Sequence, residues 1–332
     1  MSWDIFGHDQ VVNILRNHIL QDEVRHAYLF VGIPGTGRRT IALQFAQALN
    51  CSEPPAPGEF CGKCRNCRQI AAQQHPDLIV TETETVGTIL KIDEIRDLQH
   101  TLSLAPYESR WRIGLLLRFD EANQNAQNAL LKILEEPPEN VKLLLTADSE
   151  NSLLPTITSR CEVMHLFPVN PAQLTSYLTD RYQVESKAAE SAAHLSAGRV
   201  GFAISLLKEP EKAEQMNRTA AECLEMFSQN TRERFRYASN FKDYKKRTEL
   251  REVLQVWQSV MRDLLLLSTD GKLTAQSLTF IDFHSESASL AAKYSTEQFH
   301  ELIRHLNRSL EYLDANVSPQ LLLEELLLNF PS

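Results

Sequence analysis

Residues 25–50 read RHAYLFVGIPGTGRRTIALQFAQALN, which places an apolar run, a glycine-rich turn and a helix-forming segment in direct succession. The run at 26–31 predicts a buried strand, residues 32–37 predict a tight turn, and the apolar spacing over 40–50 predicts a helix. Glycines suit such a turn because successive backbone N–H groups can curl round an anion at a helix N-terminus. The order of strand, phosphate-sized loop and helix indicates a nucleotide-binding type of core.

The end of the turn lacks the residues that handle a nucleoside triphosphate. A working loop ends in Gly-Lys-Ser/Thr, whose lysine contacts the terminal phosphates and whose hydroxyl holds magnesium. Arg38 and Arg39 fill those two positions here; Arg38 keeps the charge on a bulkier fork, and Arg39 cannot ligate a metal. The hydroxyl of Thr40 comes one position late, turned by about 100°. The candidate nucleotide-contacting set is Gly32, Gly35, Gly37, Arg38, Arg39 and Thr40, and the sequence leaves open whether it retains ADP or ATP.

Four cysteines follow the helix in the pattern C-x9-C-x2-C-x2-C, at Cys51, Cys61, Cys64 and Cys67. Two overlapping C-x2-C pairs and one further cysteine provide four thiolates, enough for a closed tetrahedral zinc site with no open position for chemistry. The residues between them are rich in proline and glycine, which indicates a loop and not a buried core. A disulfide framework is the weaker alternative, because a chain of this length does not need such cross-links. We therefore predict one structural zinc ion bound by these cysteines.

The overall composition indicates a soluble chain of two or three domains. The 332 residues are 43% hydrophobic, and no apolar run is long enough to span a bilayer, which argues against membrane insertion. Six cysteines, four of them in one cluster, fit a reducing cytoplasm. The net charge of −9 argues against a chain that wraps DNA through bulk electrostatics, although it leaves room for a local basic patch.

Further strands and helices alternate along the first 160 residues. The sequence predicts strands at 75–80, 113–117 and 142–147, helices at 68–74, 90–104 and 127–136, and a helical turn at 154–161. This alternation indicates an α/β domain whose parallel sheet is covered on both faces. The pair Asp120-Glu121 follows the strand at 113–117. It could hold magnesium and polarise water, but two solvated acids opening a helix are the favoured interpretation.

Several of these segments together resemble the bacterial clamp-loader AAA+ proteins, the family that includes the gamma/tau and delta-prime subunits of DNA polymerase III. The segments are 26–30, the turn at 32–37, the four cysteines, Asn128-Ala-Leu-Leu-Lys-Ile-Leu-Glu-Glu-Pro-Pro138 and Ser159-Arg-Cys161. They occur in order across the first two hundred residues. The resemblance implies an α/β AAA+ core at 1–167 with a zinc-binding insertion at 51–67, a small helical lid at 168–208, and an all-α collar at 211–332 that assembles a five-subunit ring.

Three departures from the active members imply a non-hydrolysing subunit. Active members carry Gly-Lys-Thr at the end of the turn, where this chain has Arg38 and Arg39 at the lysine and threonine positions. Asp120-Glu121 lies some three residues closer to the Asn-Ala-Leu-Leu-Lys motif than in active members. Gly201 stands where those members carry a sensing arginine. The resemblance then implies a cytoplasmic stator that joins gamma/tau and delta subunits and helps load the sliding clamp onto primed DNA. A gamma/tau-like ATPase that uses Arg38 and the shifted Thr40 is the alternative.

Arg160, in Ser159-Arg-Cys161, is the candidate catalytic residue. The resemblance implies that this arginine projects to the adjacent subunit and acts in trans as an arginine finger on its nucleotide. Without the resemblance, a salt bridge to a nearby carboxylate is the favoured interpretation.

A basic, aromatic segment at 232–251 has eight arginines and lysines, interrupted by three acids, and four aromatic residues. Contact with nucleic acid is one interpretation, and a solvated helix face with its aromatic residues in the core is the favoured one. A third functional hypothesis, a zinc-dependent nucleic-acid module at 51–67, is weak because Phe60 is the only aromatic residue there for stacking.

Overall fold

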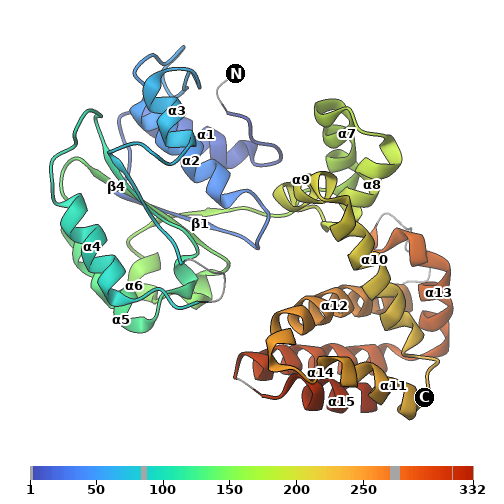
Figure 1. Ribbon diagram of the computed structural model, residues 1–332. Helices are drawn as coiled ribbons and strands as arrows, with labels where there is room; N and C mark the ends of the chain where they lie inside the picture. Colours follow the sequence, from blue (N-terminus) through green and yellow to red (C-terminus); the bar gives the residue numbers. More distant parts are fainter. Residues whose placement is uncertain (1–2, 84–87, 270–276, 316, 332) are drawn as a thin grey trace. The chain divides into compact units, whose positions relative to one another are not determined.

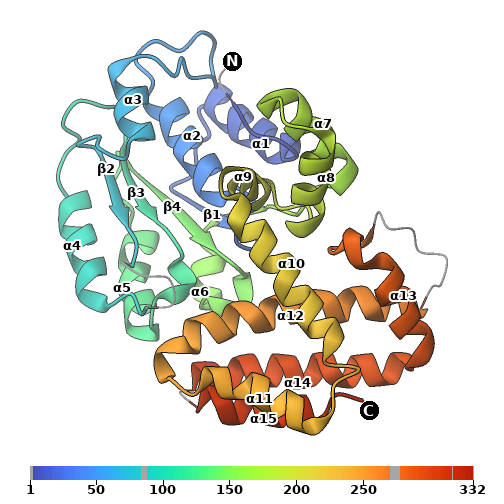
Figure 2. The same cartoon turned by 45° about the vertical axis from the view of Figure 1, so that its right-hand side comes forward.

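A five-stranded, all-parallel sheet organises the N-terminal part of the chain, in the strand order β2-β3-β4-β1-β5 (Figures 1 and 2). The strands are β1 (Ala27–Val31), β2 (Leu78–Thr81), β3 (Arg112–Leu116), β4 (Val141–Ala147) and β5 (Glu162–His165). Every residue of β1, β3 and β4 is buried, as expected for central strands covered on both faces. The structure, a computed structural model, describes residues 3–83, 88–269, 277–315 and 317–331.

Helices cover both faces of this sheet. The helices are α1 (Asp9–Leu20), α2 (Arg38–Asn50), α3 (Arg65–Ala71), α4 (Ile92–Leu102), α5 (Gln124–Glu135) and α6 (Pro155–Thr158). One apolar cluster joins α1, α2 and α3 to the sheet, and a second joins α4, α5 and α6 to its other face. The clusters account for the alternation of strand and helix seen in the sequence, because each helix buries its apolar stripe on the sheet.

The strand β5 was missing from the sequence-based prediction. Its four residues begin with Glu162 and end with His165, so the segment lacks the apolar run that marks the other strands. It pairs with β1 at the edge of the sheet, where one face can remain partly exposed. The helix expected at 40–50 begins at Arg38, because Gly37 adopts φ +104° and turns the chain into it.

By its internal contacts the chain divides into two units, Met1–Val169 with Arg199–Phe202, and Asn170–Gly198 with Ala203–Ser332. The second unit is helical in its described residues. Its helices are α7 (Pro171–Tyr182), α8 (Ser186–Leu195), α9 (Val200–Lys208, whose first turn belongs to the first unit), α10 (Pro210–Glu225), α11 (Thr231–Ala238), α12 (Arg247–Thr269), α13 (His284–Lys293), α14 (Thr296–Asp314) and α15 (Pro319–Leu328). In both units, the described helices are all too short or too polar to traverse a bilayer.

The buried side chain of Trp257, on the long helix α12, lies at the centre of the C-terminal helices. Its ring stacks on Tyr237 from α11 and meets Phe330, after α15, edge-on. Helix α12 also packs against α10, α13 and α14, which makes it the central element of this bundle. Leu264 and Leu267 are buried, so the apolar segment 264–267 belongs mainly to the intramolecular core.

A buried carboxylate, Asp263 on α12, makes the stability of this bundle depend on pH. Its Oδ2 accepts hydrogen bonds from the backbone N–H groups of Thr279 (2.8 Å) and Phe280 (2.9 Å). Burial outweighs these bonds and raises the pKa of Asp263 to about 6. The pKa of Asp263 is thus higher in the folded than in the unfolded protein, so protonation of this carboxyl favours the folded state. Its contribution to the free energy of unfolding is fully present below about pH 4 and is lost as the pH rises through about 6.

We expect the replacement Asp263→Asn to flatten this pH dependence. The opening free energy at the Thr279 and Phe280 amides, measured by hydrogen exchange and corrected for intrinsic rates, should fall by on the order of 2 kcal/mol between pH 4 and 7 in the natural protein. The variant should show little of this fall, because an amide does not titrate. Equal slopes in the two proteins would mean that another group causes the dependence.

Candidate functional site

The turn between β1 and α2 keeps the backbone form of a phosphate-binding loop. Gly35 and Gly37 adopt φ of +89° and +104°, a conformation that favours glycine. The buried Thr36 donates its hydroxyl to the carbonyl oxygen of Ile33 at 2.9 Å, and the ring Nε2 of buried His8 lies 2.9 Å from the carbonyl oxygen of Thr36. Hydrogen bonds within the turn and with His8 therefore stabilise the conformation of the turn.

Arg38, the first residue of α2, pairs with a carboxylate of the chain itself. Its Nη1 lies 2.6 Å from Oδ1 of Asp148, and only 10% of its side chain is exposed. Asp148 follows β4, and its backbone N–H donates to Oδ1 of Asp120 at 3.3 Å. Burial, and then the charge of Asp148, raise the pKa of Asp120. The cation at the start of the helix is therefore neutralised internally, at the place where an active loop would use its lysine on a phosphate.

Arg39 and Thr40 carry the two remaining polar side chains of the candidate set. Arg39 donates from Nη2 to Oε1 of Gln73 at 2.8 Å, and its Nη1 lies 3.4 Å from Oε2 of Glu82. The side chain of Thr40 is exposed. Neither residue contributes to the cluster around Arg38.

Glu121, the second acid of the Asp120-Glu121 pair, is engaged by neighbouring side chains. Arg118 donates from Nε to Oε2 of Glu121 at 3.1 Å, and the hydroxyl of Thr83 donates to the same oxygen. Only 14% of the Glu121 side chain is exposed. The favoured interpretation of two solvated acids at the start of a helix was thus wrong: the pair ends a 3-10 turn (Phe119–Glu121) and sits largely within the protein.

The first turn of α9 lies directly against the phosphate-binding turn. The N–H of Gly201 donates to the carbonyl oxygen of Gly35 at 2.8 Å. A Cβ atom added to Gly35 would lie 2.8 Å from the Cβ atom of Phe202, and one added to Gly201 would lie 3.0 Å from the Gly35 oxygen. Glycine at both positions permits this approach. Gly201, which the sequence analysis noted in place of the sensing arginine of active members, makes a backbone contact with the turn.

Arg160 lies just after the short helix α6, on the surface of the first unit. Its Nη2 lies 2.9 Å from Oε1 of Glu135, at the end of α5, and its Nη1 donates to the carbonyl oxygen of Thr156 at 2.9 Å. The side chain is 36% exposed. The salt bridge that the sequence offered as the alternative role is therefore present, and the guanidinium remains accessible.

The four cysteines of the loop come together in one cluster. Their sulfur atoms all lie within 4.8 Å of one another, with Cys51 Sγ 3.6 Å from Cys61 Sγ and 4.0 Å from Cys64 Sγ. Four thiolates about 2.3 Å from a tetrahedral zinc ion would be about 3.8 Å apart, so the donor set fits this metal. The cluster could hold one ion between the end of α2 and the start of α3.

Hydrogen bonds at the cluster also favour thiolate. Backbone N–H groups of Cys61, Cys64 and Cys67 point at the sulfur atoms of Cys51, Cys61 and Cys64, at 3.3, 3.2 and 3.4 Å. Burial acts to raise the pKa of Cys64, but hydrogen bonds from Ser52 and from the Cys67 backbone outweigh it and bring it to about 6. Burial raises the pKa of Cys51 and of Cys67. A bound metal ion would offset this by favouring the thiolate form of both cysteines.

The basic segment 232–251 has both a structural and an exposed side. Arg234 is buried and donates to four backbone carbonyl oxygens, of Met226, Leu327, Phe330 and Pro331, at 2.9 to 3.2 Å. Tyr237 and Phe241 face the core, as the favoured interpretation expected, whereas Phe235 and Tyr244 are exposed. The structural role of Arg234 was missed, because its carbonyl partners lie mostly at the far C-terminal end of the chain.

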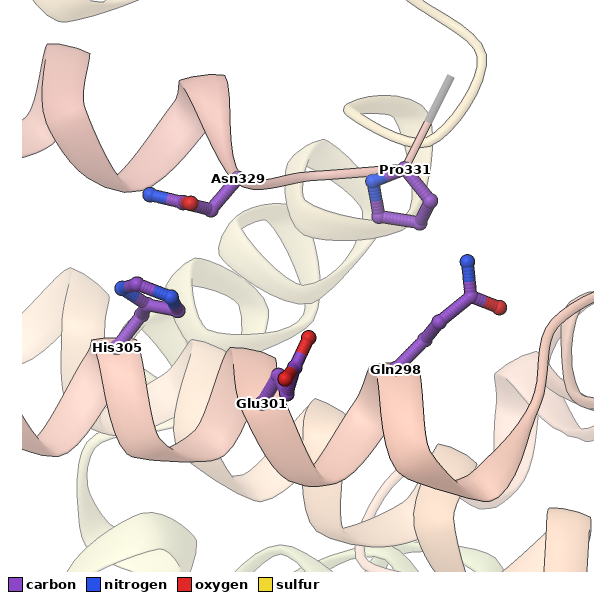
Figure 3. A pocket seen from close by; sticks show the side chains of 5 residues that line it. All are labelled: Gln298, Glu301, His305, Asn329 and Pro331. Atoms are coloured by element: carbon purple, nitrogen blue, oxygen red, sulfur yellow. The ribbon is translucent and has the colours of Figure 1, made fainter.

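A small hollow of about 130 Å³ lies elsewhere in the second unit (Figure 3). It is lined by Gln298, Glu301 and His305, which line up along α14, and by Asn329 and Pro331 after α15. None of the predicted site residues contributes to it. We assign it no function.

Comparison with known proteins identifies relatives over the whole chain. The family described as "DNA polymerase III, delta subunit" matches residues 7–170. DNA polymerase III subunit delta' of Bacillus subtilis is 29% identical over 334 residues, covering 99% of this chain and 98% of its own. Subunit delta' of Pseudomonas aeruginosa is 41% identical over 136 residues, 41% of each chain, and subunit tau of Escherichia coli is 34% identical over 208 residues, 61% of this chain and 32% of its own.

A solved structure shares the fold of this chain. A DNA polymerase III gamma subunit-related protein of Thermotoga maritima aligns with a TM-score of 0.51 at 20% identity, over 96% of this chain and 97% of its own. At this identity the likeness shows the fold alone. The sequence relatives show what the chain is similar to: bacterial DNA polymerase III subunits, with the delta' subunit of Bacillus subtilis matched over almost its whole length.

Proposed function

We propose that this chain is a non-hydrolysing delta' subunit, a stator of the clamp loader that helps load the sliding clamp onto primed DNA in the cytoplasm. The observation that carries the proposal is the internal pairing of Arg38 with Asp148 at the start of α2. In an active loop the corresponding lysine contacts nucleotide phosphates. Here the charge is already satisfied, and the loss of a magnesium-binding hydroxyl at Arg39 removes the metal as well.

The proposed partners are gamma/tau and delta subunits. In this proposal, residues 1–167 form the AAA+ core, 168–208 the lid and 211–332 the collar that assembles the ring. Leu321 and Leu328, seven residues apart on α15, are 62% and 60% exposed and offer an apolar strip to a neighbouring subunit. The test is to mix this chain with gamma/tau and delta of the same organism: one complex containing all three supports the proposal, and failure to co-elute at micromolar concentration contradicts it.

Within this ring, Arg160 would act in trans on a neighbour's ATP. The arginine lies on the surface at the end of α6, and its planar fork matches the oxygens of a transferring phosphoryl group. The subunit would thus complete an active site while hydrolysing nothing itself. The four cysteines would hold a structural zinc ion that fixes the loop at 51–67.

The isolated protein is expected to show no ATP turnover above background, and no thermal stabilisation by MgATP, because a ligand that does not bind the folded state leaves its stability unchanged. The double replacement Arg38→Lys plus Arg39→Thr should not restore turnover. Gly201 would still leave the lid without its charge, and its backbone would still contact Gly35.

A phosphate-release assay on the isolated chain checks this expectation, with an active gamma/tau subunit as the positive control. Robust hydrolysis by the unmodified chain would replace the stator with the gamma/tau-like ATPase. Revival by the double replacement alone would show that Gly201 and its contact do not block activity.

A further inference from the structure

The guanidinium of Arg160 is held along one side by acceptors from two different elements. Glu135, the last residue of α5, pairs with Nη2, and the carbonyl oxygen of Thr156, in α6, accepts from Nη1; both contacts are 2.9 Å long. A guanidinium has five N–H donors in a fixed plane, so these contacts leave others for an anion. The group is accessible, yet its plane is already defined.

The charge of Glu135 has no evident value for the helix that carries it. Helix α5 ends at Glu135, ahead of Pro137 and Pro138, and an acid in the last turn meets the negative end of the helix dipole. A neutral side chain at this position would avoid the unfavourable interaction with the helix dipole. The one ion pair described for Glu135 is the one with Arg160. The adjacent Glu136 is also exposed to solvent, makes no ion pair among the described residues, and serves as the matched control.

We propose that Glu135 is a positioning residue for Arg160: it fixes the guanidinium before assembly so that the free donors face the phosphate of the neighbouring subunit's nucleotide. This inference rests on the trans role of Arg160 proposed above. A long arginine side chain loses rotamer freedom when it is immobilised. If Glu135 and Thr156 already restrict the rotamers of Arg160 before assembly, less conformational entropy is lost during the reaction. The arginine then reaches the phosphate in a productive geometry.

The replacement Glu135→Gln tests this role with little change in shape. In a ring reconstituted from otherwise unmodified subunits, single-turnover hydrolysis at the neighbouring site should slow by on the order of 10-fold, within the ~100-fold that a displacement of about 1 Å can cost. The loss should appear in the maximal rate and not in the ATP concentration for half-maximal rate, because the arginine acts on the transferring phosphate. Glu136→Gln should leave the rate unchanged, and Glu135→Asp should recover part of it.

A double-mutant comparison separates positioning from a merely structural role. If Glu135 acts through Arg160, adding Glu135→Gln to Arg160→Ala should change nothing further. If Glu135 only stabilises the surface around α5 and α6, its replacement should slow both backgrounds or reduce ring assembly, which size-exclusion chromatography reports directly.

The outcomes distinguish this inference from the function on which it rests. If Arg160→Ala leaves every site at its normal rate, the trans arginine itself is wrong, and the role of Glu135 falls with it. If Arg160→Ala silences a site while Glu135→Gln leaves the rate unchanged or raises it, the arginine finger stands and the positioning role is wrong. A rise would mean that the carboxylate restrains the arginine instead of presenting it.

Discussion

Replacing Arg160 with alanine is expected to silence ATP hydrolysis at one neighbouring site while the ring still assembles. Loss of an arginine finger costs on the order of 10³ to 10⁵ in rate, because no other group neutralises the charge that develops on the transferring phosphate. The subunit itself should remain folded. The side chain is 36% exposed, and a surface ion pair such as that with Glu135 contributes about 1 kcal/mol or less.

The measurement is single-turnover hydrolysis in the reconstituted complex with every other subunit unmodified. Total steady-state turnover should fall only partly, because the remaining sites keep their own arginines, unless the sites are coupled. Arg160→Lys should also fail, since a point charge on a flexible stem does not reproduce the planar fork.

A matched control for Arg160 is Arg96→Ala. Arg96 is another exposed arginine in a surface pair, with Asp93 at 3.4 Å, and should have no effect. Normal rates at every site with Arg160→Ala fully incorporated would assign Arg160 a structural role only.

The first unit could be predicted from sequence wherever local pattern determines structure. The apolar runs that became β1, β3 and β4, and the glycines of the turn at 32–37, carry their own signals, since burial and positive φ act on the residues themselves. Strand β5 carries no such signal, because its pairing with β1 is what makes it a strand.

The contacts that define the candidate site could not be predicted in the same way. Arg38 with Asp148, Arg160 with Glu135, and Gly201 with Gly35 each join residues from separate elements. Their side-chain types are visible in the sequence, but which acid meets which arginine depends on strand order and on where each helix ends. The sequence identified Arg38 and Gly201 as departures from active family members, and the structure adds what each of them contacts.

One zinc ion per chain is expected to co-purify, and the double replacement Cys64→Ser plus Cys67→Ser should abolish it. A serine hydroxyl is a poor substitute for thiolate, and two of the four ligands would be lost. A structural zinc site with its full ligand set has a binding free energy of roughly 10–16 kcal/mol at neutral pH. Removing two of the four ligands should remove enough of this free energy to empty the site. Metal analysis of the purified protein measures this directly.

The effect on structure should stay local to the loop. Phe60 packs with Cys64 and Cys67, and Trp3 packs edge-on against Phe60, so tryptophan fluorescence should report loosening there. The parallel sheet should persist, because its apolar clusters are formed by other residues.

Acid and chelators should both release the ion, because the ligands bind as thiolates. Protons compete with the metal for the sulfur atoms, so the ion should leave as the pH falls. Cys223→Ala, which removes a buried cysteine outside the cluster, is the matched control and should keep a full equivalent of zinc. Unchanged zinc after Cys64→Ser plus Cys67→Ser would refute the four-cysteine site, and loss of zinc in Cys223→Ala as well would mean that metal content follows general stability and not this cluster.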